Sequence, residues 1–276
     1  MGEVHETTDF VLSNIGDYSD LNASNKKDAG AKFDQKLGLL LNSNAIKFEP
    51  INQKIVRCSK DGRDLPIIIK APDLESGKTL DETLMDYEKH VELLGSEFVE
   101  AIIPIRITNP ESVVTLKKTF LASAFIPDEL KTQLLDQDFI DVFAQDERDL
   151  RGGLNIWDYI IKNTDSMDES TKNNLIILLR RLINASDQGY YIDIPFFPDE
   201  ENAIGKKRNR DNLIVDKEGP TLLDSGTIYK YEPKQMVGCE LNALSAQIAL
   251  DILEKKTIPK ESYEIMGRES KRLNNQ

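Results

Sequence analysis

The chain has 276 residues, enough for one large domain or two small ones. With 39% hydrophobic and 30% charged residues, it can bury a core and stay in solution. The 35 Lys and Arg residues against 48 Asp and Glu residues give a formal net charge of −13, which argues against a general nucleic-acid-binding protein.

The cysteine and histidine content excludes several kinds of site. Cys58 and Cys239 are too few and too far apart for a disulfide framework or a zinc site, so we expect buried free thiols. His5 and His90 are the only histidines, which makes a His-rich metal site or a Ser-His triad a poor interpretation. No apolar run is long enough to cross a membrane, and the acidic N-terminal residues lack the pattern of a secretory signal. We therefore expect a cytoplasmic protein without a membrane partner, with delivery into another cell as an open alternative.

The first part of the chain contains loop and strand signals. Residues 1–32 are polar and predict a flexible N-terminal lead-in. From Ile46 the pattern is β-like, and residues 55–58 and 66–70 predict the two strands of a hairpin. The second of these strands ends in Lys70.

Between residues 79 and 125 the sequence predicts one helix and two more strands. Thr79, followed by acidic residues, marks the start of the helix, and Gly95 suits its C-terminus. The apolar stripe of this helix consists of Leu84, Tyr87, Val91 and Leu94. Residues 101–107 and 113–116 are then expected to form strands.

The second half of the chain is mainly helical. Helices are expected at residues 139–143, 156–161, 171–185 and 241–253. Between the last two we expect a short extended segment, residues 190–195, and a hairpin formed by residues 213–215 and 221–223.

Five polar residues occupy informative places in this pattern. Lys70 ends a strand, Glu88 lies on the following helix, Asp193 precedes the hairpin, and Asn212 and Asp224 flank it. A polyphosphate needs a cation beside it, and a helical carboxylate can hold that cation in place. Magnesium prefers hard oxygen ligands such as an amide carbonyl and a carboxylate. A further carboxylate is needed to position a hydroxyl nucleophile.

In this order the motifs resemble those of the protein-kinase-like superfamily, which includes small-molecule phosphotransferases. The resemblance covers about residues 46–256. In the first part of the chain it rests on residues 66–70, which resemble the Val-Ala-Ile-Lys strand, and residues 87–94, which resemble the third helix. In the second part, residues 191–193 stand in place of His-Arg-Asp, and residues 240–253 resemble the helix after the activation segment. Residues 212–226 resemble the metal-binding hairpin with Asp-Phe-Gly, here with Ser225 instead of Phe.

The resemblance implies a two-lobed α+β fold. A small antiparallel-sheet N-lobe with one helix would comprise residues 33–122, and an abbreviated helical C-lobe would comprise residues 123–276. A hinge near Leu121–Phe125 would bind the adenine of ATP through the backbone of Ala122 and Ala124.

The implied function is transfer of a phosphoryl group from ATP·Mg²⁺ to a hydroxyl acceptor, either a protein or a small molecule. Lys70 would contact the α- and β-phosphates, and Glu88 would orient Lys70. Asp193 would act as the base, while Asn212 and Asp224 would bind the metal.

Departures from the family pattern keep other interpretations open. No Gly-x-Gly-x-x-Gly precedes the Lys70 strand, where Asn42–Asn44 is the nearest flexible stretch, and no Ala-Pro-Glu follows Asp224. An insertion, residues 194–211, splits the catalytic loop. It contains the basic residues Lys206, Lys207, Arg208 and Arg210. These residues form either a solvated loop or a site for phosphate or an acidic partner. A pseudokinase that binds without turnover, or a nucleotidyltransferase, therefore remains an alternative.

Overall fold

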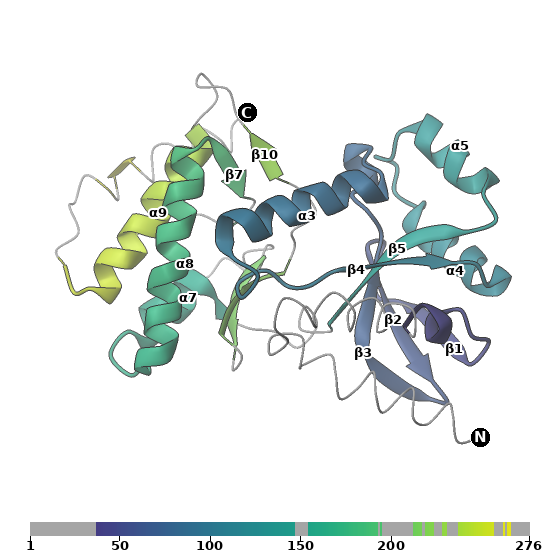
Figure 1. The fold of residues 1–276 in the computed structure, drawn as a ribbon, viewed down its shortest axis with the longest axis horizontal. Coiled ribbons are helices and arrows are strands. Elements are labelled where there is room, and N and C mark those ends of the chain that lie inside the picture. Colours follow the sequence, from purple (N-terminus) through teal and green to yellow (C-terminus); the bar gives the residue numbers. More distant parts are fainter. Residues whose placement is uncertain are drawn as a thin grey trace, which may run out of the picture. The chain divides into compact units, whose positions relative to one another are not determined.

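The computed structural model divides into two compact units (Figure 1). Unit 1 comprises residues 1–84 and 101–147, and unit 2 comprises residues 85–100 and 148–276. The residues that the structure describes are 37–146, 154–192, 194, 212–216, 219–223, 228–230, 237–256, 262 and 264–265.

Unit 1 is built on a five-stranded antiparallel sheet with the order β1-β2-β3-β5-β4. Its strands are β1 (Ile46–Pro50), β2 (Ile55–Lys60), β3 (Arg63–Lys70), β4 (Ile103–Ile107) and β5 (Ile140–Asp146). The predicted hairpin is confirmed, since β2 and β3 pair and are joined by Asp61 and Gly62, both at positive φ (52° and 77°), as a tight hairpin turn requires. The expected α+β class with a small antiparallel sheet is likewise confirmed.

One face of this sheet forms the core of unit 1. Residues that alternate along the strands, such as Val56, Ile67, Ile69 and Val142, are almost fully buried in one apolar cluster. The helix α4 (Pro110–Phe120) adds Val113, Leu116 and Phe120 to the same cluster. A second helix, α5 (Asp128–Asp136), follows it.

The strand expected at residues 113–116 is wrong, because these residues belong to α4. Asn109 caps the helix by accepting a hydrogen bond from Ser112 N (3.2 Å), and Pro110 occupies the first turn, where its fixed φ suits a helix. These start signals and the helical spacing of the buried residues outweigh the β-branched Val-Val-Thr run.

The helix expected at residues 139–143 is also wrong, because these residues lie in and next to β5, which pairs with both β3 and β4. An apolar run this short fits a buried helix or a buried strand equally well. Pairing with β3 and β4 makes it a strand. The last strand of the sheet therefore comes only after α4 and α5, so unit 1 extends to residue 147 and not to residue 122.

The helix expected after Thr79 is confirmed as α3 (Leu80–Leu94), which follows the short 3₁₀ helix η2 (Leu74–Ser76). Thr79 N donates to Glu82 Oε2 (2.8 Å) and Glu82 N donates to Thr79 Oγ1 (3.3 Å), which is a capping box. At the other end Gly95 has φ +95°, and Arg181 Nη1 donates to the carbonyl of Leu94.

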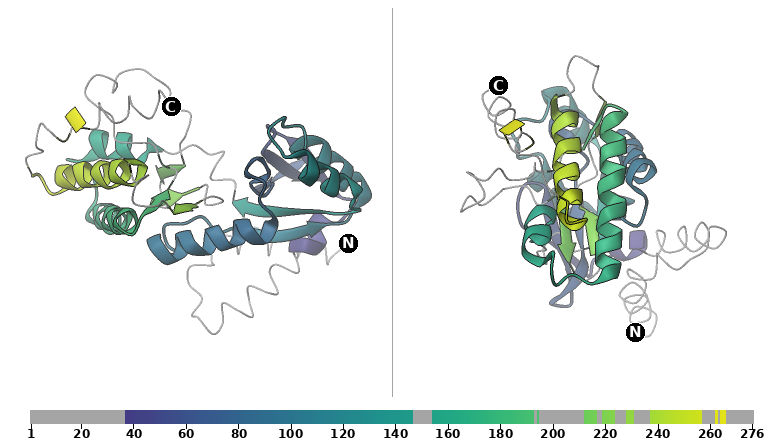
Figure 2. Two further views of the ribbon diagram at one scale, coloured as in Figure 1. Left: turned by 90° about the horizontal axis from the view of Figure 1, so that it is seen from above. Right: turned by 90° about the vertical axis from the view of Figure 1, so that its left-hand side faces the viewer.

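Unit 2 contains the helices α7 (Ile156–Asn163), α8 (Glu169–Asp187) and α9 (Val237–Leu253), which confirm the three remaining helix predictions. α8 and α9 lie side by side in both figures (Figures 1 and 2). The described strands of this unit form a three-stranded sheet, order β6-β8-β9, and a β7–β10 pair; they are β6 (Leu154–Asn155), β7 (Tyr190–Ile192), β8 (Leu213–Asp216), β9 (Gly219–Leu222) and β10 (Ile228–Lys230).

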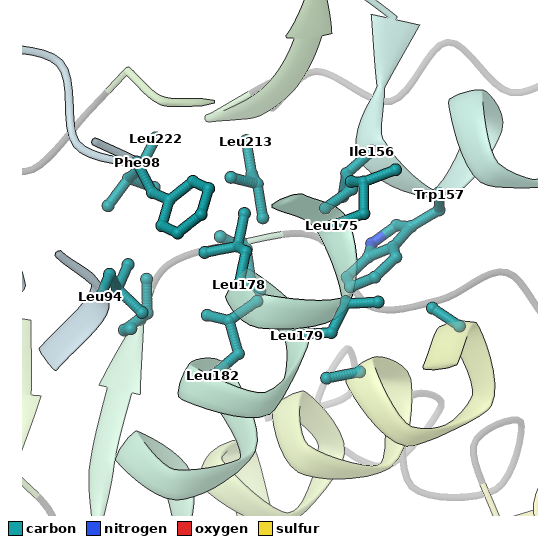
Figure 3. Close-up of a cluster of buried hydrophobic side chains, with 14 of the residues drawn as sticks. Leu94, Phe98, Ile156, Trp157, Leu175, Leu178, Leu179, Leu182, Leu213 and Leu222 are labelled. Atoms are coloured by element: carbon teal, nitrogen blue, oxygen red, sulfur yellow. The ribbon is translucent and has the colours of Figure 1, made fainter. Parts of the chain in front are cut away.

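Figure 3 shows the core of unit 2, in which one face of α8 meets Trp157 and the β8–β9 hairpin. Leu178 and Trp157 are fully buried, and Leu213 and Leu222 of the hairpin lie in the same cluster. Burial of the hairpin's apolar side chains fixes it against the helices, so the residues at its ends occupy defined positions.

Both cysteines are free and buried, as expected. Burial raises the pKa of the Cys58 and Cys239 thiols, which keeps both in the unreactive protonated form. In the described part of the chain, no helix is both long and apolar enough to span a membrane.

The conformation of Gly95 generates a first prediction. Gly95→Ala forces a side chain into φ +95° and places its Cβ 1.9 Å from Arg181 Nη1, whereas a Cβ at Gly62 (φ +77°) meets nothing within 4 Å. We expect Gly62→Ala to lower the free energy of unfolding by about 1–2 kcal/mol, and Gly95→Ala by clearly more, because it also displaces the Arg181 contacts. Urea denaturation followed by circular dichroism measures both, and equal losses would contradict the role of Arg181.

Candidate functional site

Lys70 is the last residue of β3, the middle strand of the unit 1 sheet. It pairs with Ile55 of β2 and Phe143 of β5 and is half-buried. Because Ile67 and Ile69 point into the core, strand alternation places Lys70 on the opposite face of the sheet. Alternation and register place Ile55, Arg57, Ile68, Phe143 and Gln145 on this Lys70 face as well.

The turn between β1 and β2 lies at the same end of the sheet as Lys70, since Ile55 pairs with Lys70. Four of its backbone N–H groups are bonded inside the turn. Asn52 Oδ1 accepts from Lys54 N (2.7 Å) and Ile55 N (2.8 Å), and the carbonyl of Ile55 accepts from Ile51 N (2.9 Å) and Asn52 N (3.2 Å). These N–H groups are therefore committed and do not form the phosphate-binding backbone loop of the kinase pattern.

Asn42–Asn44 does not replace that loop either. Asn42 Oδ1 accepts from Thr108 N (2.6 Å), and its Nδ2 donates to the carbonyls of Gly38 (2.9 Å) and Arg106 (3.0 Å). Asn109 Nδ2 donates to Asn44 Oδ1 (2.6 Å). This stretch thus fixes the chain at the end of β4 and is not a flexible loop.

Glu75 is a residue that the sequence analysis did not identify. Its carboxylate accepts from Ser123 Oγ (2.7 Å) and pairs with Lys54 Nζ (2.7 Å), and these partners hold the pKa of Glu75 below its ordinary value. The network joins the β1–β2 turn, the segment after β3 and the loop after α4.

Ala122 and Ala124 flank Ser123 and are exposed in the connection between α4 and α5. The chain passes between the two units at residues 84/85, 100/101 and 147/148, so the predicted hinge at Leu121–Phe125 does not join them. This correction follows from the misassigned strands: the crossing comes after β5, and residues 147–153 lie outside the described part of the chain.

Glu88 is exposed on α3, one helical turn from Met85 and from Glu92, which are also exposed. The buried side of the helix carries His90 and Leu94. Glu88 belongs to unit 2, whereas Lys70 belongs to unit 1. The exposure of Glu88 argues against a buried, fixed carboxylate in the role of orienting Lys70.

The hairpin formed by β8 and β9 follows Asn212, one of the two residues expected to hold a metal, and ends shortly before the other, Asp224, in the sequence. Leu213 pairs with Leu222, and the carbonyl of Asn212 accepts a hydrogen bond from Leu223 N (2.7 Å). Asn212, which is half-buried, is therefore opposite the residue that precedes Asp224. Asp224 itself lies outside the described residues, as do Asp193 and the basic residues Lys206, Lys207, Arg208 and Arg210.

The β7–β10 pair lies next to this hairpin in the sequence. Ile192 pairs with Ile228 in an antiparallel ladder, so the chain leaves β7 and enters β10 at the same end. The carbonyl of Ile192 accepts from Ile194 N (2.8 Å) and from Nδ2 of Asn242 on α9 (2.7 Å). Asn242 thus holds the residue directly before Asp193, and its signal in the sequence was a polar residue within an apolar helix.

The chain around α3 also contacts these strands within unit 2. Asp86 Oδ2 accepts from Ile228 N (3.3 Å), and the carbonyl of Phe98 accepts from Leu222 N (2.8 Å). Glu100 N donates to the carbonyl of Leu222 (2.9 Å). The hairpin and β10 are therefore tied to α3 and to the segment after it, contacts that no sequence pattern indicated.

A scan against protein-family models gives no match for this sequence, and a search of curated proteins finds no significant relative. Within the described ranges, which omit Asp193 and Asp224, no group of three or more His, Cys, Asp or Glu side chains could hold a metal ion. The function is therefore argued from the arrangement of residues alone.

The contact of Asn242 generates a second prediction. Asn242→Ala leaves the carbonyl of Ile192 without its amide donor and should lower the free energy of unfolding by about 1–3 kcal/mol. The control Gln247→Ala removes an exposed hydrogen bond to Asp251 Oδ1 (2.9 Å) on the same helix and should cost less than about 0.5 kcal/mol. Urea denaturation followed by Trp157 fluorescence reports on this unit, and similar costs for both variants would show that Asn242 has no special role.

Proposed function

We propose that the protein is a kinase-like phosphotransferase that uses ATP and Mg²⁺ to phosphorylate a hydroxyl group. The observation that carries the proposal is the hydrogen bond between Leu223 N and the carbonyl of Asn212 (2.7 Å). It fixes the backbone of Asn212 opposite Leu223, the residue that precedes Asp224 in the sequence. An amide oxygen together with a carboxylate is a suitable ligand set for magnesium.

The proposed roles are those of the corresponding residues in the kinase pattern. Lys70 binds the α- and β-phosphates, and Asn212 and Asp224 bind the metal. Asp193 accepts the proton of the acceptor hydroxyl, and the Asn242 contact supports its neighbour Ile192.

The acceptor is proposed only as a hydroxyl compound, protein or small molecule. The basic residues Lys206, Lys207, Arg208 and Arg210 would attract ATP or an acidic acceptor, since the chain as a whole carries a net charge of −13.

A second candidate is a pseudokinase that binds a partner or a nucleotide without turnover. It is favoured by the committed backbone donors of the β1–β2 turn and by the exposure of Glu88. Both features weaken the parts that hold and orient phosphates in the kinase pattern.

A thermal shift assay with ATP tests the nucleotide and metal assignments together. Wild-type protein should melt at higher temperature with ATP, and further still when Mg²⁺ is present, because a ligand that binds only the folded state stabilises it. Asp224→Ala should abolish the magnesium-dependent part and keep the magnesium-free part, while Asp216→Ala on the same hairpin is the control. An unchanged magnesium effect in Asp224→Ala would reject the metal assignment.

The role of Glu88 has a separate test. If Glu88 orients Lys70 in the nucleotide complex, Glu88→Gln should lower the rate of ATP turnover by about tenfold or more without a change in melting temperature. Glu92→Gln, on the same exposed side of α3, should leave turnover within about twofold. Equal rates in the two variants would remove Glu88 from the mechanism.

A further inference from the structure

Arg57 stands out among the charged residues of the unit 1 sheet. It pairs with Ile68 of β3, on the same face as Lys70, and Ile55 pairs with Lys70 itself. Arg57 and Lys70 are therefore diagonal neighbours on adjacent strands, a separation of about 7–8 Å or slightly less between their Cβ atoms. Long side chains at this separation reach the same ligand.

The guanidinium of Arg57 is poorly satisfied. Its only described ion pair is a long one, 3.6 Å from Nη1 to Oδ2 of Asp64, and both side chains are substantially exposed (39% and 57%). Its Nε is buried and has no hydrogen-bond partner among the described residues. A buried N–H without an acceptor costs free energy, which an oxygen-rich ligand would recover.

Arg106 on β4 of the same sheet serves as a comparison, because its guanidinium donors are hydrogen-bonded to a carboxylate. Its Nε and Nη2 donate to the two oxygens of Asp141 (2.8 and 2.9 Å), so the side edge of the guanidinium is filled by one carboxylate. In the described part of the chain, no carboxylate is bonded to the corresponding edge of Arg57. This two-donor edge matches a phosphate group as well as it matches a carboxylate.

The residues around Arg57 on this face are suited to a polar ligand. Gln145 and Ser59 are buried polar residues on the same side of the sheet. Glu49 of β1 is opposite Arg57 in the register but exposed. Exposed carboxylates such as Asp64 and Glu49 hold a cation weakly, so a polyphosphate can displace them.

We propose that Arg57 and Lys70 together form a two-cation site for a polyphosphate group, in which Arg57 grips one phosphate with its side edge and Lys70 binds another. The inference rests on the proposed function, because it takes Lys70 as a phosphate ligand. The two side chains supply hydrogen-bond donors beside the β1–β2 turn, whose N–H groups at Ile51, Asn52, Lys54 and Ile55 are already bonded within the turn. The ligand is a nucleoside triphosphate or a free polyphosphate, which share this chemistry.

Titration calorimetry of the full chain with sodium tripolyphosphate, and separately with ATP, tests the inference. Wild-type protein should bind both ligands, and Arg57→Gln should weaken both by about tenfold or more. Arg57→Lys should recover only part of the loss, since lysine lacks the two-donor edge, and it also serves if Arg57→Gln fails to fold. Asp64→Asn should tighten binding, because it removes the competing carboxylate.

Arg63→Gln is the matched control. Arg63 is an exposed arginine at the start of β3, so its removal changes the net charge by the same amount and should alter the affinity by less than about twofold. Equal weakening in Arg57→Gln and Arg63→Gln, or none in either, would overturn the Arg57 assignment and leave the proposed function standing.

The two ligands separate the remaining outcomes. If wild-type protein binds neither ligand, the proposed function and the two-cation site are both wrong. If Arg57→Gln weakens ATP but not tripolyphosphate, or if wild-type protein binds only ATP, Arg57 does not hold phosphate and the inference fails alone. Weakening of tripolyphosphate and ATP to the same degree identifies the phosphates as the bound groups.

Discussion

The position of β3 between β2 and β5 is the constraint on which unit 1 depends. β3 hydrogen-bonds on both sides, and its residues Ile67, Ile68 and Ile69 are at most 2% exposed, so both faces of the strand are covered. A slip of one residue in the register would turn Lys70 into the apolar core and bring core residues to the other face. The cost of burying an unpaired ammonium therefore fixes Lys70 on its face of the sheet.

A comparable constraint holds the hairpin of unit 2. Leu222 pairs with Leu213 in the register of the hairpin, and on its other side its N–H donates to the carbonyl of Phe98 and its carbonyl accepts from Glu100 N. Its side chain lies in the core with Trp157. The rigid part of the hairpin is thus apolar and buried, and the polar residue Asn212 sits at its edge, where the core ends. Placing reactive groups at the ends of fixed strands gives them defined positions without burying their charge.

The polar chemistry near Lys70 differs from a backbone phosphate loop. The β1–β2 turn closes on itself through Asn52, which accepts from Lys54 N and Ile55 N, and Lys54 Nζ pairs with Glu75. Among the described residues, the register places Lys47, Arg57, Lys70 and Arg106 on this face, and Arg106 is already paired with Asp141. A phosphate held here by side chains would therefore be bound by Lys70 and Arg57. Side-chain cations bind phosphate as movable charges, whereas glycine-rich backbone binds it as a fixed cradle.

The sequence by itself determined the elements whose signals are local. The β2–β3 hairpin, α3 with its start at Thr79, α8 and the β8–β9 hairpin were all predicted, because turn residues, helix-start signals and apolar periods act within a few residues of one another. The end of β3 at Lys70 and the place of Asn212 at the start of β8 were predicted on the same basis.

Only the tertiary structure decided the remaining features. Phe139–Phe143 carries no period that separates strand from helix, and it became β5 because β3 and β4 offered hydrogen bonds on both sides. That choice moved the end of unit 1 to residue 147 and removed Ala122 and Ala124 from any hinge. The exposure of Glu88 and the hydrogen bond from Asn242 to the carbonyl of Ile192 likewise depend on which strands and helices meet. Such contacts join residues far apart in the chain, and no local pattern encodes them.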